Sequence, residues 1–243
     1  MRRFTLVMVW LLCAPVGSAE PHPCARGEHV QGKVSHAGRG NSFYLLKSNQ
    51  AFVLADIVGV PAERQLPLPT GIVDLYFVDR APDRYSRQPV HLFYSLGWWQ
   101  GELLQSGQAL SFALGADSAC LKAMLDAESK NTASKANHWQ DRGLELRATD
   151  LPELLAKAGN FVLVTGIVLS VGDRTRRLYL NFGQNWAQDF TVSVAKTGAG
   201  KFAGNWRRLT ELKGRKIRVR GVLESNQGPL IRVIDDAQIQ IIN

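Results

Sequence analysis

A short polar run, Asp83-Arg84-Tyr85-Ser86-Arg87, places a carboxylate, an aromatic ring and two guanidinium groups within five residues. It precedes an apolar stretch, so a tight turn before a strand is expected. The planar fork of Arg87 can bind a phosphate group, and Asp83 and Tyr85 would then contact substrate beside it. A structural alternative is that Asp83 and Arg87 lock the turn while Tyr85 packs into the core.

A second group of arginine and aromatic residues lies in the C-terminal half of the chain. Aromatic rings interleaved with cations suit single-stranded nucleic acids, because each stacked base contributes about 1–3 kcal/mol. The candidate binding residues are Arg176, Arg177, Tyr179, Trp186, Trp206, Arg207 and Arg208. For Tyr179, Phe182, Trp186 and Phe190, core or turn positions are the alternative. The five histidines do not have the spacing of metal ligands, so structural or surface roles are expected for them.

Alternating apolar stretches separated by turns predict two mainly β units with a few helices, an α+β fold class. In the first unit, strands are expected at Gln31–His36, Ser42–Leu46, Ala51–Val58, Gly71–Val78 and Val90–Tyr94, with helices at Trp98–Gly107 and Ala119–Trp139. In the second, strands are expected at Phe161–Val171, Arg176–Asn181, Phe190–Ala195, Lys216–Leu223, Leu230–Ile234 and Ile239–Ile242. The pattern predicts two small β-barrels, over residues 20–140 and 160–243, joined by a linker or short helix over 141–159.

The order of the first stretches resembles the staphylococcal-nuclease-like (thermonuclease) family over about residues 29–140. The family's Asp-Lys/Arg-Tyr-Gly-Arg motif corresponds to Asp83–Arg87, its Leu-Leu-x-x-Gly motif to Leu103–Ala109, and its Ala-Glu helix to Ala127–Trp139. The resemblance implies an OB-like barrel capped by helices, calcium-dependent phosphodiester hydrolysis, and a catalytic clamp on phosphate at Arg87. The run Tyr179–Thr191 resembles the C-terminal domain that follows such modules in some exported bacterial proteins. It also looks like an oligonucleotide/oligosaccharide-binding barrel.

Several catalytic positions of that family are not matched. The position of one calcium-binding Asp is Asn41; the catalytic Arg falls on Val53 or Leu54, the second metal Asp on Val58 or Gly59, and the general-base Glu on Ala62. A neutral amide holds a hard divalent cation poorly, since it supplies an oxygen without charge. Only Glu63, as a candidate catalytic base, or Asp56 could compensate in a rebuilt loop. We therefore expect no metal site and no cofactor, with Ca²⁺ needed only by a nuclease with relocated carboxylates.

The N-terminus is typical of a secretory signal peptide over residues 1–19. Arg2 and Arg3 precede an apolar run of about a dozen residues, which is short for a membrane span, and small residues follow. We expect cleavage, export to the periplasm or medium, and no stable membrane anchor afterwards. Cleavage leaves Cys24 and Cys120, an even pair that is expected to form a disulfide in an oxidising compartment; two buried free thiols are the alternative.

The formal charge of +8 favours an anionic partner. Residues 20–140 carry 11 cations and 11 anions, whereas residues 141–243 carry 16 cations and 10 anions, so the surplus lies in the second unit. We expect an exported, nuclease-like protein with a degenerate catalytic site that binds nucleic acid or another polyanion. The alternatives are a calcium-dependent nuclease and a structural or interaction protein of the cell envelope. The sequence does not define an oligomeric state.

Overall fold

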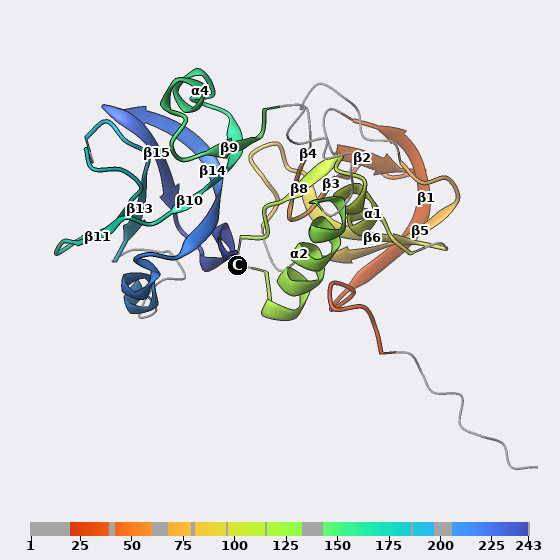
Figure 1. The fold of residues 1–243 in the computed structure, drawn as a ribbon. Coiled ribbons are helices and arrows are strands. Elements are labelled where there is room, and N and C mark those ends of the chain that lie inside the picture. The colour runs from red at the N-terminus through yellow and green to blue at the C-terminus, as the bar shows by residue number, and fades with distance from the viewer. Residues whose placement is uncertain are drawn as a thin grey trace, which may run out of the picture.

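The computed structural model describes residues 20–38, 42–59, 68–78, 81–95, 97–114, 116–132, 143–185, 187–196 and 206–242. The predicted signal peptide therefore lies outside the described residues. The protein is mainly β with a few helices, which confirms the expected fold class at that level (Figure 1). Within the described ranges, no helix combines the length and apolar character needed to cross a membrane.

The first unit contains a closed barrel of five strands. The strands of this unit are β1 (His29–Ala37), β2 (Ser42–Leu45), β3 (Ala51–Leu54), β4 (Ile57–Gly59), β5 (Ile72–Phe77), β6 (Gln88–Tyr94), β7 (Gly97–Trp98) and β8 (Ala109–Ser111). Neighbouring strands pair in the order β3-β2-β1-β5-β6, and a parallel pairing of β6 with β3 closes the ring. The first of the two predicted barrels is thus confirmed.

One predicted strand of this unit is divided. The expected strand Ala51–Val58 separates into β3 and β4, because Asp56 adopts a φ of 62° and turns the chain between them. Aspartate is among the few non-glycine residues that tolerate this left-handed conformation. The short β4 then leaves the barrel and pairs with β8.

Two helices, α1 (Trp99–Gln105) and α2 (Ser118–Thr132), pack against the barrel core. Residues that alternate along the strands, such as Val73, Leu75 and Leu92, are completely buried beneath Leu104 of α1. A disulfide joins Cys24, in the segment before β1, to Cys120 in the first turn of α2. The expected disulfide is therefore present, and it fastens α2 to the N-terminal segment.

The second unit is built on a large mixed sheet. Its elements are β9 (Glu145–Arg147), α4 (Leu151–Ala156), β10 (Phe161–Ile167), β11 (Ser170–Asp173), β12 (Arg177–Asn181), β13 (Thr191–Ala195), η1 (Trp206–Leu212), β14 (Lys216–Asn226), β15 (Gly228–Val233), η2 (Asp236–Gln238) and β16 (Ile239–Ile241). The strand order is β11-β12-β13-β15-β14-β10-β9, and β16 pairs with β14. Part of the expected linker thus forms β9 and α4.

The expected strand Phe161–Val171 also divides, into β10 and β11. The N–H of Val168 donates to the carbonyl of Arg215, whereas the N–H of Leu169 donates to the carbonyl of Asn181. The chain bends here because consecutive donors face different neighbouring strands. Consequently β10 pairs with β14, while β11 pairs with β12.

The two units meet at a buried ion pair between α2 and β14. Both terminal nitrogens of Arg220 lie 2.9 Å from the carboxylate oxygens of Glu128, and Nη1 also donates to the carbonyl of Ser111. Arg220 is only 1% exposed and Glu128 only 3%. Nearby, the rings of Phe112 and Phe161 pack edge to face, with centroids 4.9 Å apart. These contacts fix β14 against the first unit (Figure 1).

Candidate functional site

The run Asp83–Arg87 forms a tight turn before β6. Asp83 Oδ1 accepts hydrogen bonds from the N–H groups of Tyr85 and Arg87, and its Oδ2 lies 2.6 Å from Arg87 Nη2. Burial raises the pKa of Asp83, but the hydrogen bonds from the Arg87 side chain and the two backbone N–H groups outweigh it and hold the pKa below its ordinary value. Asp83 and Arg87 therefore lock the turn.

Tyr85 projects outward from this turn. The residue is 62% exposed, and the guanidinium carbons of Arg84 and Arg87 lie 4.8 and 5.0 Å from the centroid of its ring. The alternative in which Tyr85 packs into the core is wrong: Ser86 adopts a left-handed φ of 58°, and Tyr85 is exposed to solvent. The turn offers a cation–π stack at the surface, although the Arg87 fork is already occupied by Asp83.

The family's calcium site does not fit the residues described here. Val58 and Gly59 lie in β4, where they pair with β8 and offer no side-chain oxygen. Asp56, which could have compensated, is buried and its Oδ2 lies 3.1 Å from Nε2 of His91. Val53 and Leu54 belong to β3, and Asn41, Ala62 and Glu63 lie outside the described residues. The described residues at these positions therefore do not supply the charged oxygens that calcium prefers beside Arg87.

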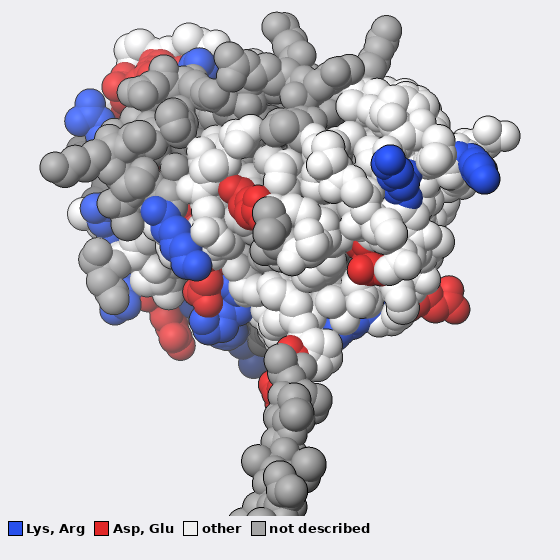
Figure 2. Space-filling view, turned by 90° about the vertical axis from the view of Figure 1, so that its right-hand side faces the viewer, with Lys and Arg blue, Asp and Glu red and all other residues white. Residues whose placement is uncertain are grey.

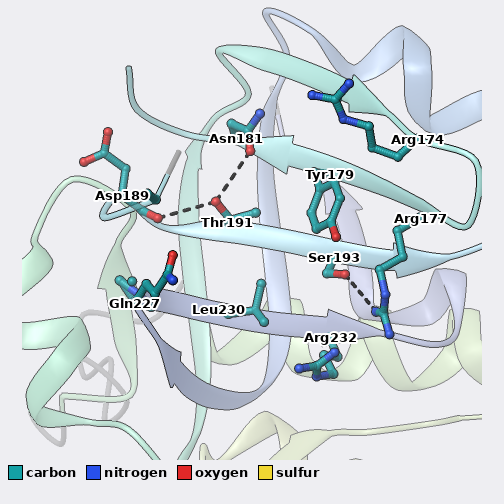
Figure 3. A pocket seen from close by; sticks show the side chains of 14 residues that line it. Arg174, Arg177, Tyr179, Asn181, Asp189, Thr191, Ser193, Gln227, Leu230 and Arg232 are labelled. Atoms are coloured by element: carbon teal, nitrogen blue, oxygen red, sulfur yellow. Dashed lines mark hydrogen bonds between the residues drawn. The ribbon is translucent and has the colours of Figure 1, made fainter. Parts of the chain in front are cut away.

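A different site occupies the outer face of the second sheet. It is a cavity of about 590 Å³, within the range of small-ligand pockets. The cavity is lined by Gly172, Arg174, Arg177, Tyr179, Asn181, Ala187, Asp189, Thr191, Ser193, Gln227, Gly228, Pro229, Leu230 and Arg232. Polar and cationic side chains from β12, β13 and β15 point into it around the ring of Tyr179 (Figure 3).

Strand register explains why these residues meet. In the sheet, Gly172 is opposite Tyr179, Tyr179 is opposite Ser193, and Ser193 is opposite Arg232. Because side chains alternate between the two faces of a strand, this row lies on one face while Leu178, Val192 and their neighbours enter the core on the other. One face of four strands therefore carries the aromatic ring, the hydroxyls and the guanidinium groups.

The charge of the cavity is mainly positive. Its lining contains three arginines, Arg174, Arg177 and Arg232, but one acidic residue, Asp189. Arg177 donates from Nη1 to the hydroxyl of Ser193, and Arg232 forms an exposed ion pair with Glu224. No carboxylate of the described residues pairs with Arg174. Arginine forks with unused donors are suited to phosphate, sulfate or carboxylate groups.

Residues 187–189 and the β14–β15 hairpin form one wall of the cavity. Asp189 accepts a hydrogen bond from the N–H of Asn185, which folds the loop onto itself. Gly228 lies so close to this loop that a Cβ at this position would be 2.7 Å from the carbonyl oxygen of Gln188. Thr191 contacts both Asn181 and the Asp189 carbonyl, at 3.5 and 3.4 Å (Figure 3). The position of this wall is therefore fixed by close contact between the backbone at Gly228 and the backbone at Gln188.

The residues predicted for binding are distributed over several places. Arg177 and Tyr179 line the cavity, and exposed Arg176 lies in the adjoining turn. Arg207 and Arg208 lie on η1, and Arg208 lines a second hollow of about 490 Å³ together with residues of α2. The backbone of Trp206 begins η1, and Trp186 lies outside the described residues. Phe182 and Phe190 are core residues, as the alternative expected.

Sequence reasoning missed Arg174, Asn181, Ser193 and Arg232. A usable signal existed within β12, where Arg177, Tyr179 and Asn181 follow a period of two. Arg232 and Ser193 join them only through strand pairing, which no local pattern reveals. No protein-family model matches the chain, and no curated protein shows significant similarity to it.

Proposed function

We propose that this exported protein, periplasmic or secreted, binds single-stranded nucleic acid or a related polyanion through the cavity of its second unit. The observation that carries the proposal is the row Tyr179–Ser193–Arg232, flanked by Arg174 and Arg177 on one sheet face. A base can stack on the tyrosine while phosphates meet the guanidinium groups. The disulfide Cys24–Cys120 supports an oxidising, extracytoplasmic location.

The strand order supports an OB-like barrel for this unit. In the first unit the five barrel strands, in chain order, are β1, β2, β3, β5 and β6. The first strand pairs antiparallel with the second and with the fourth, the second with the third, and the fourth with the fifth, while the third pairs parallel with the fifth. We infer that β10 and β11 together act as one bent first strand, since only Val168 and Leu169 separate them. With that assignment, β12, β13, β14 and β15 repeat the same pairings. The cavity then occupies the face and hairpin loops by which OB-folds bind oligomers.

The nuclease-like unit contributes less positive charge to this function. Figure 2 shows that its outward face, on the right in Figure 1, carries only scattered charges of both signs. Its catalytic positions Val58 and Gly59 have no charge, and the Arg87 fork is engaged by Asp83. We therefore propose binding rather than hydrolysis.

The test is binding of a fluorescent single-stranded oligonucleotide to the mature chain, followed by anisotropy over a range of salt concentrations. Three arginine–phosphate contacts should give a log–log slope of about −2, since each single-strand contact contributes about −0.7. Arg174→Gln should reduce the slope by one contact, whereas Arg147→Gln, an exposed control on β9, should leave it unchanged. An absence of salt-dependent binding would favour the envelope-scaffold alternative. Calcium-dependent cleavage that Arg87→Ala abolishes would instead establish the nuclease.

A further inference from the structure

A buried cluster of sulfur and ionisable side chains in the first unit has no part in the proposed binding site. The side chains of Cys24, His91 and Cys120 come together beneath α2, and each residue is at most 5% exposed. Their possible ligand atoms all lie within 4.8 Å of one another. The carboxylate of buried Asp56 is the fourth polar group, 3.1 Å from Nε2 of His91.

The contacts of His91 are not those of a nucleophile relay. In a Cys–His–Asp relay the acid and the nucleophile contact opposite ring nitrogens. Here Asp56 Oδ2 and Cys120 Sγ, 3.1 and 3.6 Å away, both contact Nε2. The other nitrogen, Nδ1, is buried and has no hydrogen-bond partner among the described residues. A set of donors converging on one side of an imidazole is typical of a metal centre.

Two of the distances in the cluster are close to those of tetrahedral zinc. With Zn–S near 2.3 Å and Zn–N and Zn–O near 2.0–2.2 Å, neighbouring ligand atoms are separated by about 3.6 Å for S···N and about 3.4 Å for N···O. The Cys120–His91 and Asp56–His91 contacts are already close to these values. For the metal to enter, the two sulfurs must separate to about 3.8 Å; their Cα atoms are 4.8 Å apart.

We propose that the dithiol form of this protein binds one Zn²⁺ through Cys24, Cys120, Nε2 of His91 and Asp56. Cysteine enters the chain as a thiol, so this form precedes the disulfide. Zinc binding releases two thiol protons and forms two Zn–S bonds, without electron transfer. Formation of the disulfide instead passes two electrons to a disulfide oxidant, which becomes a dithiol, and releases the metal. Zinc and the disulfide are thus alternative occupants of the same cluster.

One feature of the fold favours the metal-bound form. Cys120 lies in the first turn of α2, where the helix dipole stabilises a thiolate. In the zinc-bound form Nδ1 of His91 would carry the ring proton, because Nε2 must be unprotonated to bind the metal. His22 is excluded as a ligand through Nδ1, because that nitrogen accepts the N–H of Cys24.

The experiment is a metal titration of the mature chain after reduction with a phosphine, in the absence of air. Co²⁺ should give a thiolate-to-cobalt charge-transfer absorption at one equivalent, and Zn²⁺ should displace it. His91→Gln should weaken zinc binding at least about 100-fold and Asp56→Asn about 10–100-fold. His29→Gln, at an exposed position, is the matched control and should bind as the unaltered chain does. Oxidised glutathione should release one zinc for every two thiols lost.

Three results would overturn the proposal. One is a reduced chain that keeps its circular-dichroism spectrum but binds no stoichiometric metal. Another is a His91→Gln variant that binds zinc as tightly as the unaltered chain, which would reduce the site to two thiols. If reduction alone unfolds the protein, zinc must restore the folded spectrum; failure to do so also rejects the site.

Discussion

The buried pair Arg220–Glu128 gives the sharpest test of how the two units are held together. Replacing Arg220 with alanine leaves the Glu128 carboxylate uncompensated at an almost fully buried position. Breaking a buried ion pair in this way typically costs about 3–5 kcal/mol. The carbonyl of Ser111 loses its guanidinium donor as well. We expect Arg220→Ala to lower the free energy of unfolding by about 3–5 kcal/mol, a large part of an ordinary domain's stability.

The double variant Arg220→Met with Glu128→Leu should be less damaging than the sum of the single changes. It removes both charges, so the penalty of an isolated buried charge disappears. It still leaves the N–H of Ser111 without the Glu128 oxygen that accepts it at 2.6 Å, which costs about 1–3 kcal/mol. We therefore expect non-additive losses with a favourable coupling energy of about 2 kcal/mol or more.

Urea unfolding followed by circular dichroism and tryptophan fluorescence measures these losses. The matched control is Arg232→Ala, whose ion pair with Glu224 is about 40% exposed and should contribute about 0–1 kcal/mol. If Arg220→Ala costs no more than Arg232→Ala, the contact is not a desolvated charge pair and the reasoning fails. If only the signal of one unit shifts, the units unfold separately and the interface does not couple them.

Three further changes test other parts of the structure. Gly228→Ala places a Cβ 2.7 Å from the neighbouring loop backbone, so oligonucleotide affinity should fall about tenfold and stability by about 1–3 kcal/mol, whereas Gly172→Ala, whose Cβ would meet only ordinary contacts, should leave stability nearly unchanged. A Cys24→Ser/Cys120→Ser double variant opens a loop of 96 residues and should lose roughly 4–5 kcal/mol in urea unfolding; a loss below about 1 kcal/mol would contradict this. The folded pKa of Asp83 is below its ordinary value of 3.8, so its stabilising effect is present above that value and is lost as pH falls through the folded pKa. Unfolding curves of Asp83→Asn and the unaltered chain should therefore converge in acid.

Local pattern was sufficient to predict the features that depend on sequence neighbours. Alternation predicted the strands of the first barrel, and the Asp83–Arg87 run predicted a tight turn before a strand, with locking of that turn by Asp83 and Arg87 as the structural alternative. The pairing of Cys24 with Cys120 followed from there being two cysteines after the predicted signal peptide. Each of these depends on residue type and spacing alone.

The cavity could not be predicted in the same way. Tyr179, Ser193 and Arg232 lie on three strands, and a shift of one residue in any register would turn its side chain into the core. The break at Asp56 was likewise hidden, since its left-handed backbone depends on where β4 and β8 pair. Long-range pairing decided both features.

The structure also shows that not every surplus cation of the second unit is available to an anionic ligand. Arg218 and Arg220 belong to the cationic second unit, but both form ion pairs whose side chains are at most 15% exposed. Arg218 pairs with Glu145 of the same unit, and Arg220 pairs with Glu128 of the first unit. Buried pairs of this kind have no charge left for an anionic ligand. By contrast, Arg174 and Arg177 stand at the ends of the β11–β12 turn and face the same cavity. Arg174 and Arg177 therefore keep positive charge available beside the ring of Tyr179, while a second exposed group of cations, Arg208, Lys213, Arg215 and Lys216, lies around η1.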